Sequence, residues 1–183
     1  MTAALPLALN LETGPASRRA GDLLAEARAH ERAGALSEAV GCYQAAVDEA
    51  ARTLDRRVEA EALRRLGVVR HHQNDRALAV ELCRRSHQVA GEVDDPILAG
   101  EALNALAGFE FEEGAIESAR IMFHRALELG GRHPALRGRI EQNLGILANI
   151  QGDHSAALDH YHRSLEACRS SGDQKGCAIA YHN

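Results

Sequence analysis

The feature that most constrains the fold is a sequence pattern that recurs about every 40 residues. Four blocks align with one another, and each carries an alanine at the same place. The blocks are GALSEAVGCYQAAV at 34–47, NDRALAVELCRRSH at 74–87, GAIESARIMFHRAL at 114–127 and GDHSAALDHYHRSL at 152–165, with Ala39, Ala79, Ala119 and Ala157. Successive alanines are separated by 40, 40 and 38 residues. Such a period is typical of an array of stacked supersecondary units.

Each unit of the pattern predicts a pair of helices. A second set of small residues comes seven positions before the turn of each unit, namely Ala27, Gly67, Ala107 and Gly145. Small residues on two facing helices allow the backbones to approach closely. The predicted turn residues are Gly34, Asn74, Gly114 and Gly152, all of types that readily adopt the left-handed conformation at a helix end. Pro96 and Pro134 fit the first turn of the helices that open the third and fourth units.

The second helix of each unit carries a stripe of aligned positions. Four residues after the small alanines come Tyr43, Cys83, Phe123 and Tyr161, and three residues later come Ala46, Ser86, Ala126 and Ser164. These offsets place all three positions on one face of a helix. The arrangement resembles the tetratricopeptide repeat (TPR) family over about residues 20–183. The resemblance implies an all-α fold, a right-handed α-solenoid in which antiparallel helix pairs stack into a superhelix.

The resemblance also predicts how the chain is divided. We expect an N-terminal extension at residues 1–16 and a TPR domain at residues 17–183. Within the domain, repeats are expected at about 20–55, 56–94, 95–132 and 133–172, followed at 173–183 by the first helix of a truncated fifth repeat. Asn183 stands 40 residues after Asn143 and in the same register, so we expect the chain to be a fragment of a longer protein.

Three features depart from the usual TPR pattern. The units are near 40 residues long instead of about 34, which resembles the longer repeats of kinesin light chains, Leu-Gly-Asn repeat proteins and many bacterial regulators. Glu26 stands where the later units have leucine, as expected for a terminal repeat whose outer side meets water. In the second unit Arg70, Cys83 and His87 replace the expected apolar or aromatic types, which predicts looser packing there.

Composition excludes several classes of protein. Hydrophobic residues make up 45% of the chain, but aromatic residues make up only 3%, which favours closely packed helices over a sandwich. The formal net charge of −5 argues against a nucleic-acid partner. No apolar window is long enough to span a bilayer, so no membrane partner is expected. The four cysteines lack paired spacing, which indicates a reducing, cytoplasmic location.

In the TPR family the first helices of the pairs line a concave groove that binds peptides or partner domains. The resemblance therefore implies a protein-protein interaction scaffold with a protein or peptide partner. The predicted groove positions are Arg28, Arg32, Arg64, Arg65, Val68, His71, His72, Asn104, Phe111, Arg139, Gln142, Asn143, Ile146 and Asn149. Asn143 is expected to bind the backbone of an extended peptide, because a side-chain amide both donates and accepts hydrogen bonds.

The basic residues of the groove have two interpretations. An acidic ligand is favoured because guanidinium groups pair with carboxylates through parallel hydrogen bonds. Ion pairs with glutamates of neighbouring helices fit the sequence equally well. The arginines concerned are Arg28, Arg32, Arg64 and Arg65, and the glutamates are Glu26, Glu31, Glu59 and Glu61.

No catalytic or metal centre is predicted. The sequence has no HExxH motif, no glycine-rich phosphate loop and no nucleophile elbow. The adjacent His71 and His72 diverge around a helix, so they do not converge on one ion. We therefore expect no enzyme activity, no cofactor and no metal in these residues.

Two further functions are alternatives to a simple scaffold. Bacterial arrays of this length often precede effector modules, so the chain is alternatively a sensory or regulatory segment of a larger signalling protein. It is alternatively an oligomerisation module that forms a homodimer, since Ile179 and Tyr181 lack a second helix to cover them. A homodimer through the N-terminal segment is also an alternative. In that segment leucines alternate along the chain, at Leu5, Leu7, Leu9 and Leu11. This alternation indicates an extended segment that docks in a groove, but a short helix that caps the first pair is an alternative.

Overall fold

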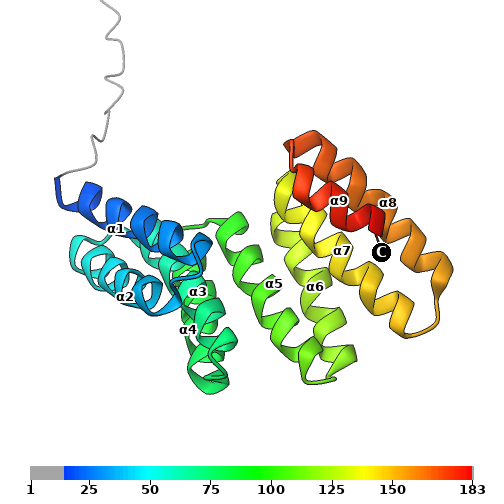
Figure 1. The fold of residues 1–183 in the computed structure, drawn as a ribbon, viewed down its shortest axis with the longest axis horizontal. Helices are drawn as coiled ribbons and strands as arrows, with labels where there is room; N and C mark the ends of the chain where they lie inside the picture. Colours follow the sequence, from blue (N-terminus) through cyan, green and yellow to red (C-terminus); the bar gives the residue numbers. More distant parts are fainter. Residues whose placement is uncertain (1–14, 183) are drawn as a thin grey trace, which may run out of the picture.

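The computed structural model describes residues 15–182, and these residues form nine helices and no strand (Figure 1). The helices are α1 (Pro15–Arg32), α2 (Leu36–Thr53), α3 (Arg56–His72), α4 (Arg76–Glu92), α5 (Pro96–Glu112), α6 (Ile116–Gly130), α7 (Pro134–Ile150), α8 (His154–Ser171) and α9 (Gln174–His182). The leucine-rich segment at residues 5–11 lies outside the described residues. Across residues 15–182, no helix has the length and apolar character needed to cross a membrane.

The helices stack as antiparallel pairs, α1 with α2, α3 with α4, α5 with α6 and α7 with α8 (Figure 1). Each pair packs against the next, and α9 packs against α8 and α7. The result is the expected all-α architecture, a right-handed α-solenoid with α1 near one end and α8 and α9 at the other.

Neighbouring pairs touch unequally along the stack. The first helices of successive pairs contact one another, α1 with α3, α3 with α5, α5 with α7 and α7 with α9. Within residues 15–182, no second helix lies close to the second helix of the next pair. A stack whose elements are closer together on one side curves toward that side. The first helices therefore line the concave side of the solenoid, and the second helices line the convex side.

The turns inside the pairs use the predicted left-handed residues. These residues and their φ angles are Gly34 (76°), Asn74 (63°), Gly114 (78°) and Gly152 (81°). After each of them, a backbone N–H donates back to a carbonyl near the end of the first helix, for example from Ala35 to His30 at 3.0 Å. This bond satisfies a carbonyl that the helix itself leaves without a partner. Pro96 and Pro134 begin α5 and α7, as predicted.

The four repeating alanines lie at the centre of the pair contacts. Their exposed fractions are 0% for Ala39, 0% for Ala79, 0% for Ala119 and 2% for Ala157. The facing glycines leave no room for a larger side chain. A Cβ atom on Gly67 would lie 2.7 Å from Sγ of Cys83, and one on Gly145 would lie 2.5 Å from Cε1 of Tyr161. Since contacting carbon atoms prefer about 3.5–4.0 Å, these small residues set the distance between the helices.

The second pair accommodates the side chains that depart from the repeat pattern, while the expectation of looser packing there stays a prediction. Cys83 is fully buried, its thiol lies 3.8 Å from a backbone carbonyl of α3, and burial raises its pKa to about 12. The hydroxyl of Ser86 donates to the carbonyl of Ala60 at 2.7 Å. Nδ1 of His87 lies 3.1 Å from the carbonyl oxygen of Ala99. Cys83 and Ser86 thus lie in the core, where backbone carbonyls of the facing helix accept their hydrogen bonds.

Candidate functional site

A row of charged side chains connects the first helices on the concave side. Arg28 of α1 pairs with Glu61 of α3, and Nη2 of Arg64 lies 2.5 Å from Oε2 of Glu101 on α5. Arg139 of α7 reaches the other oxygen of Glu101 at 2.7 Å. We call these five residues the charge ladder. It links the first helices of all four pairs, because Glu61 also lies 3.9 Å from Arg64 on the same helix.

Glu101 and Arg64 are the most enclosed members of the charge ladder, with side-chain exposed fractions of 15% and 12%. Burial raises the pKa of Glu101, but the positive charges of Arg64 and Arg139 outweigh it. The pKa of Glu101 therefore lies below its usual value of 4.5. Burial lowers the pKa of Arg64, and the charge of Glu101 opposes that effect. Glu101 is thus ionised at neutral pH and holds two arginines from different helices.

A second charged group lies beside the charge ladder in the first two pairs. Nη1 of Arg65 is 3.5 Å from Oε2 of Glu31, and the same oxygen accepts a hydrogen bond from the hydroxyl of Tyr43. Burial, together with this bond to Glu31, raises the pKa of Tyr43 above its usual value of 10.0. Four arginines were predicted to bind an acidic ligand. Three of them, Arg28, Arg64 and Arg65, form ion pairs within the protein, and Arg32 is exposed.

Two predicted groove amides meet between α5 and α7. Nδ2 of Asn143 donates to Oδ1 of Asn104 at 3.2 Å, and both side chains are half-buried. Among the described residues, the amide oxygen of Asn143 and the amide nitrogen of Asn104 have no further hydrogen-bond partner. Of the other α7 amides, Gln142 is half-buried, and Oδ1 of the exposed Asn149 lies 2.9 Å from Nδ1 of His154.

The apolar positions of the predicted groove are only partly available to a ligand. Val68, Phe111 and Ile146 are half-buried, and each packs against a buried core cluster. They therefore contribute first to packing between helices and offer a ligand only their exposed edges.

The two histidines of the predicted groove have different environments. The ring of His71 stacks on Phe109 of α5, with centroids 4.1 Å apart and planes inclined by 10°. Its Nε2 atom lies 3.7 Å from Oε2 of Glu112, which is also on α5. His72 is exposed. His71 thus helps to join α3 to α5, while His72 is open to a partner.

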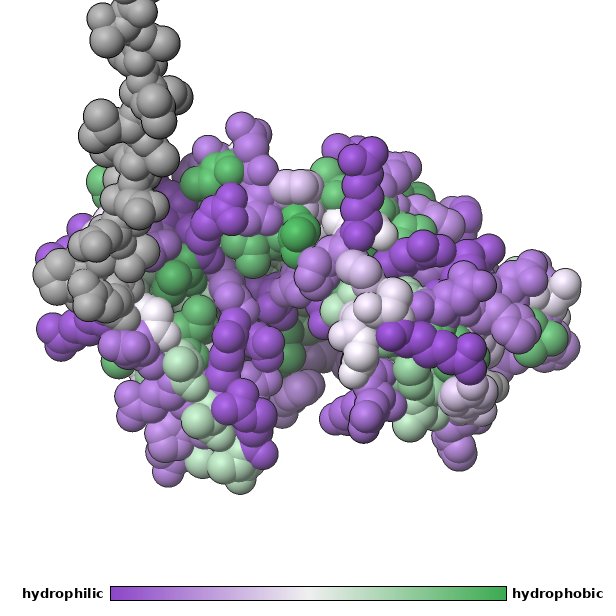
Figure 2. Space-filling view, turned by 90° about the horizontal axis from the view of Figure 1, so that it is seen from above, coloured by the Kyte–Doolittle hydropathy of each residue, from purple (hydrophilic) through white to green (hydrophobic). Residues whose placement is uncertain are grey.

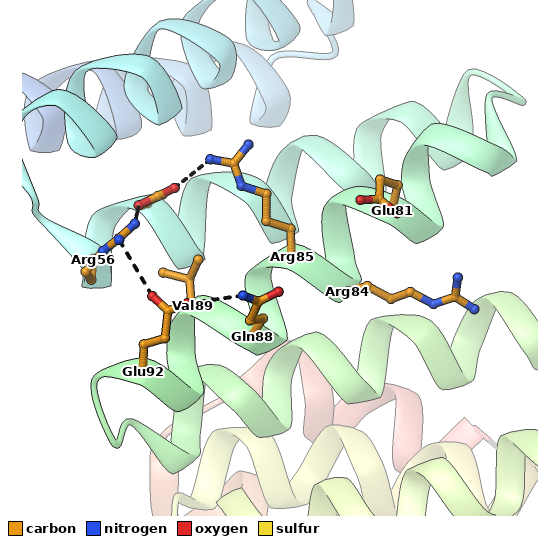
Figure 3. A pocket seen from close by; sticks show the side chains of 8 residues that line it. Arg56, Glu81, Arg84, Arg85, Gln88, Val89 and Glu92 are labelled. Atoms are coloured by element: carbon orange, nitrogen blue, oxygen red, sulfur yellow. Dashed lines mark hydrogen bonds and ion pairs between the residues drawn. The ribbon is translucent and has the colours of Figure 1, made fainter.

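A cavity of about 470 Å³ between α3 and α4 has no counterpart in the sequence analysis (Figure 3). Glu59 is fully buried beside it and accepts hydrogen bonds from Arg56 and Arg85, both at 2.8 Å. Figure 3 shows Arg84 extending away from this paired group. The lining holds three arginines, Arg56, Arg84 and Arg85, and three glutamates, Glu59, Glu81 and Glu92. The formal charges cancel, so the cavity has no simple preference for an anion or a cation.

One face of the molecule shows few apolar sites where a large hydrophobic partner would dock. Figure 2 shows a mainly hydrophilic face, with hydrophobic residues in separate patches. The exposed large hydrophobic residues are spread along the chain, from Leu54 to Tyr181. The polar concave side is therefore the better candidate for a binding surface.

No protein-family model matches the sequence, and no curated protein matches it. The crystal structure of BtubC (BKLC) from P. vanneervenii matches with a TM-score of 0.69 and 17% sequence identity, covering 89% of this chain and 68% of that chain. The fold is TPR-like. The crystal structure of MamA protein matches with a TM-score of 0.52 and 15% identity, covering 90% of this chain and 89% of that chain. At these identities the likeness concerns the TPR-like helical-repeat fold alone.

Proposed function

We propose that this chain is a protein-interaction scaffold that binds an extended segment of a partner protein along its concave side. The observation that carries the proposal is the amide pair formed by Asn104 and Asn143 between α5 and α7. An extended peptide presents both N–H and C=O groups along its length. The amide oxygen of Asn143 can accept a hydrogen bond from a peptide N–H, and the amide nitrogen of Asn104 can donate one to a peptide C=O. The helical-repeat fold supports the proposal because such stacks form extended concave surfaces.

We further propose that the bound segment carries a carboxylate. The concave residues described above include five arginines and four glutamates, which leaves an excess of one positive charge. The residues are Arg28, Arg32, Arg64, Arg65 and Arg139 against Glu31, Glu61, Glu101 and Glu112. Because the glutamates already engage most of the arginines, the net attraction is modest. Binding should therefore weaken when added salt screens exposed charges.

A capture experiment tests the amide pair. Wild-type chain, Asn143→Ala, Asn104→Ala and Arg84→Ala are immobilised and exposed to the same cell lysate, and captured proteins are identified by mass spectrometry. Arg84 is exposed on α4 and serves as the convex-side control. We expect the two asparagine variants to lose a partner that the wild type and Arg84→Ala both retain. Retention of every partner by both asparagine variants would contradict the proposed binding mode.

The acidic ligand is best tested with Arg32→Ala. Arg32 is exposed, whereas Arg64 holds the enclosed Glu101, so Arg64→Ala would leave a buried carboxylate with fewer partners. We expect Arg32→Ala to weaken binding of the captured partner and to reduce its salt dependence. An unchanged affinity at low and high salt would argue for a neutral segment.

Self-association is a second candidate function, favoured by exposed apolar side chains on α9. Ile179 and Tyr181 of α9 have exposed fractions of 38% and 63%. Pairing of two chains through α9 would remove these apolar side chains from water. Light scattering at several concentrations tests this function, and a strict monomer at high concentration would exclude it. A regulatory role in a larger signalling protein stays a prediction.

A further inference from the structure

Three side chains of types that bind metal ions meet on the first helix pair. Glu26 and His30 are one helical turn apart on α1, and Cys42 lies on α2. Their ligand atoms all lie within 4.8 Å of one another, and Nε2 of His30 is 3.8 Å from Oε1 of Glu26. Metal–ligand bonds of about 2.0–2.3 Å place tetrahedral ligand atoms about 3.3–3.8 Å apart. Small side-chain rotations would bring the three ligand atoms to these tetrahedral separations.

The sequence analysis did not find this group because no motif connects its members. Glu26 and His30 are spaced for one helix face, but the cysteine is on the partner helix, and only the packing of α1 on α2 brings it near. One sequence signal could have pointed to this group. Glu26 and His30 stand near the small residue Ala27, and Cys42 stands near the small residue Ala39.

Comparison with the second pair shows that the first pair is unusual at these positions. Glu26 and Cys42 correspond to Leu66 and Leu82, which belong to or pack against the core cluster shared with the first pair. Glu26 is exposed, so its position tolerates a charged side chain. Cys42 is half-buried and packs against the same core cluster, which holds its thiol at the edge of the core beside Glu26 and His30.

The local charge also fits a cation. The Glu26 carboxylate lies within 4.8 Å of the Cys42 thiol. A negative charge thus lies next to the thiol. A divalent ion would offset both the carboxylate and a thiolate. The thiol S–H bond would break with release of its proton to solvent as the sulfur–metal bond forms.

We propose that Glu26, His30 and Cys42 form a three-ligand site for a divalent transition-metal ion of the Zn²⁺ type, which ties α1 to α2. Sulfur and imidazole ligands favour such ions over Mg²⁺ and Ca²⁺, which prefer oxygen. Three protein ligands leave one tetrahedral position for water. Glu26 is exposed and the other two ligands are half-buried, so an ion reaches the site from solvent. This site is independent of the concave side and of the proposed function.

Cobalt titration tests the site directly. The full chain is treated with a chelator, dialysed and titrated with Co²⁺, whose bonds to thiolate give a sulfur-to-cobalt charge-transfer absorption. We expect one Co²⁺ per chain with this absorption, and displacement of Co²⁺ by Zn²⁺. Cys42→Ser should lose the charge-transfer absorption, and His30→Gln should bind at least about tenfold more weakly. Circular dichroism shows whether each variant keeps its helices.

Matched controls come from the same chain. Cys177→Ser removes another half-buried cysteine, and His72→Gln removes an exposed histidine, both far along the chain from α1. Both should bind Co²⁺ like the wild type. A wild-type chain without the charge-transfer absorption would overturn the proposal. So would an absorption that survives in Cys42→Ser, or one that disappears in Cys177→Ser instead.

Thermal unfolding gives an independent readout. A ligand that binds only the folded chain stabilises it by RT ln(1 + [L]/Kd). Zn²⁺ should therefore raise the Tm of the wild type and of His72→Gln, but not that of Cys42→Ser. An equal rise with Mg²⁺ at the same concentration would overturn the assignment to a transition metal.

Discussion

Ala119 shows how one side chain fixes the distance between two helices. It is fully buried, and it shares a core cluster with Ala107 of the facing helix and with Phe123 one turn further along α6. Packed interiors have few voids, so additional atoms at this position must push the helices apart or force side chains out of favourable rotamers.

Ala119→Leu is therefore expected to destabilise the chain by about 1–3 kcal/mol through overpacking. The matched control is Ala77→Leu, the same substitution at an exposed position of α4, where we expect a change within about 0.5 kcal/mol. Urea unfolding followed by circular dichroism measures both. Equal stabilities of the two variants would show that Ala119 does not set the spacing.

Glu101 gives a prediction that depends on pH. Its folded-state pKa lies below the usual value of 4.5, so its stabilisation is fully present above that value and is lost as the pH falls through the folded-state pKa. Glu101→Gln should be less stable than the wild type at neutral pH, because Arg64 and Arg139 lose their carboxylate. The difference in the free energy of unfolding between the two proteins should become smaller as the pH falls to about 3. Denaturant unfolding of both proteins across this pH range measures the difference. A difference that does not change with pH would contradict the role of the ionised Glu101 in holding Arg64 and Arg139.

For single residues, the sequence predicted which small side chains lie in helix contacts, but it did not predict which charged side chains pair with one another. Ala39 and Gly67 could be recognised because close packing admits only small side chains. The pairing of Arg64 with Glu101 could not be recognised, because long side chains choose partners only after α3 and α5 lie side by side. Of the two interpretations of the arginines, the structure displays the ion pairs, with Glu101 as a partner that the sequence analysis did not name.

Among the secondary-structure elements, the turns between helix pairs are less ideal than those within them. Leu54 ends α2 in the left-handed conformation with φ of 58°, and its side chain is 73% exposed. A non-glycine residue in this conformation costs about 1–2 kcal/mol. The turn that follows α8 has Gly172 at the equivalent place, with φ of 71°.

Leu54→Gly should therefore stabilise the chain by about 0.5–1 kcal/mol, since relief of strain exceeds the greater unfolded-state entropy of glycine. Leu158→Gly is the matched control, because Leu158 is 59% exposed inside α8. There the same substitution should destabilise the chain by about 1 kcal/mol. Thermal unfolding of both variants measures the shifts, and a lower Tm for Leu54→Gly would show that its side chain contributes more than its conformation costs.

Across the whole molecule, stability comes from contacts between neighbouring pairs. In such a stack each unit interacts only with its neighbours, so perturbations stay local. The contact between α6 and α7 is the least extensive of those between successive helices in the described chain. The segment from α7 to α9 should therefore open more independently than the rest.

Ala157→Leu tests this local behaviour by overpacking the α7–α8 contact. Hydrogen exchange measured by mass spectrometry should become faster in α7, α8 and α9 and stay unchanged in α1 to α4. A uniform acceleration along the chain would show that the solenoid unfolds as one cooperative unit.

The sequence by itself determined the helix pairs, their turns and their stacking, because alanine and glycine spacing and left-handed turn residues act over short distances along the chain. The tertiary structure alone decided which charges meet, which amides pair and which ligand types converge. The charge ladder, the Asn104–Asn143 pair and the group of Glu26, His30 and Cys42 each join separate helices. Their geometry depends on side-chain reach across packed helices, and no periodicity along the sequence records it.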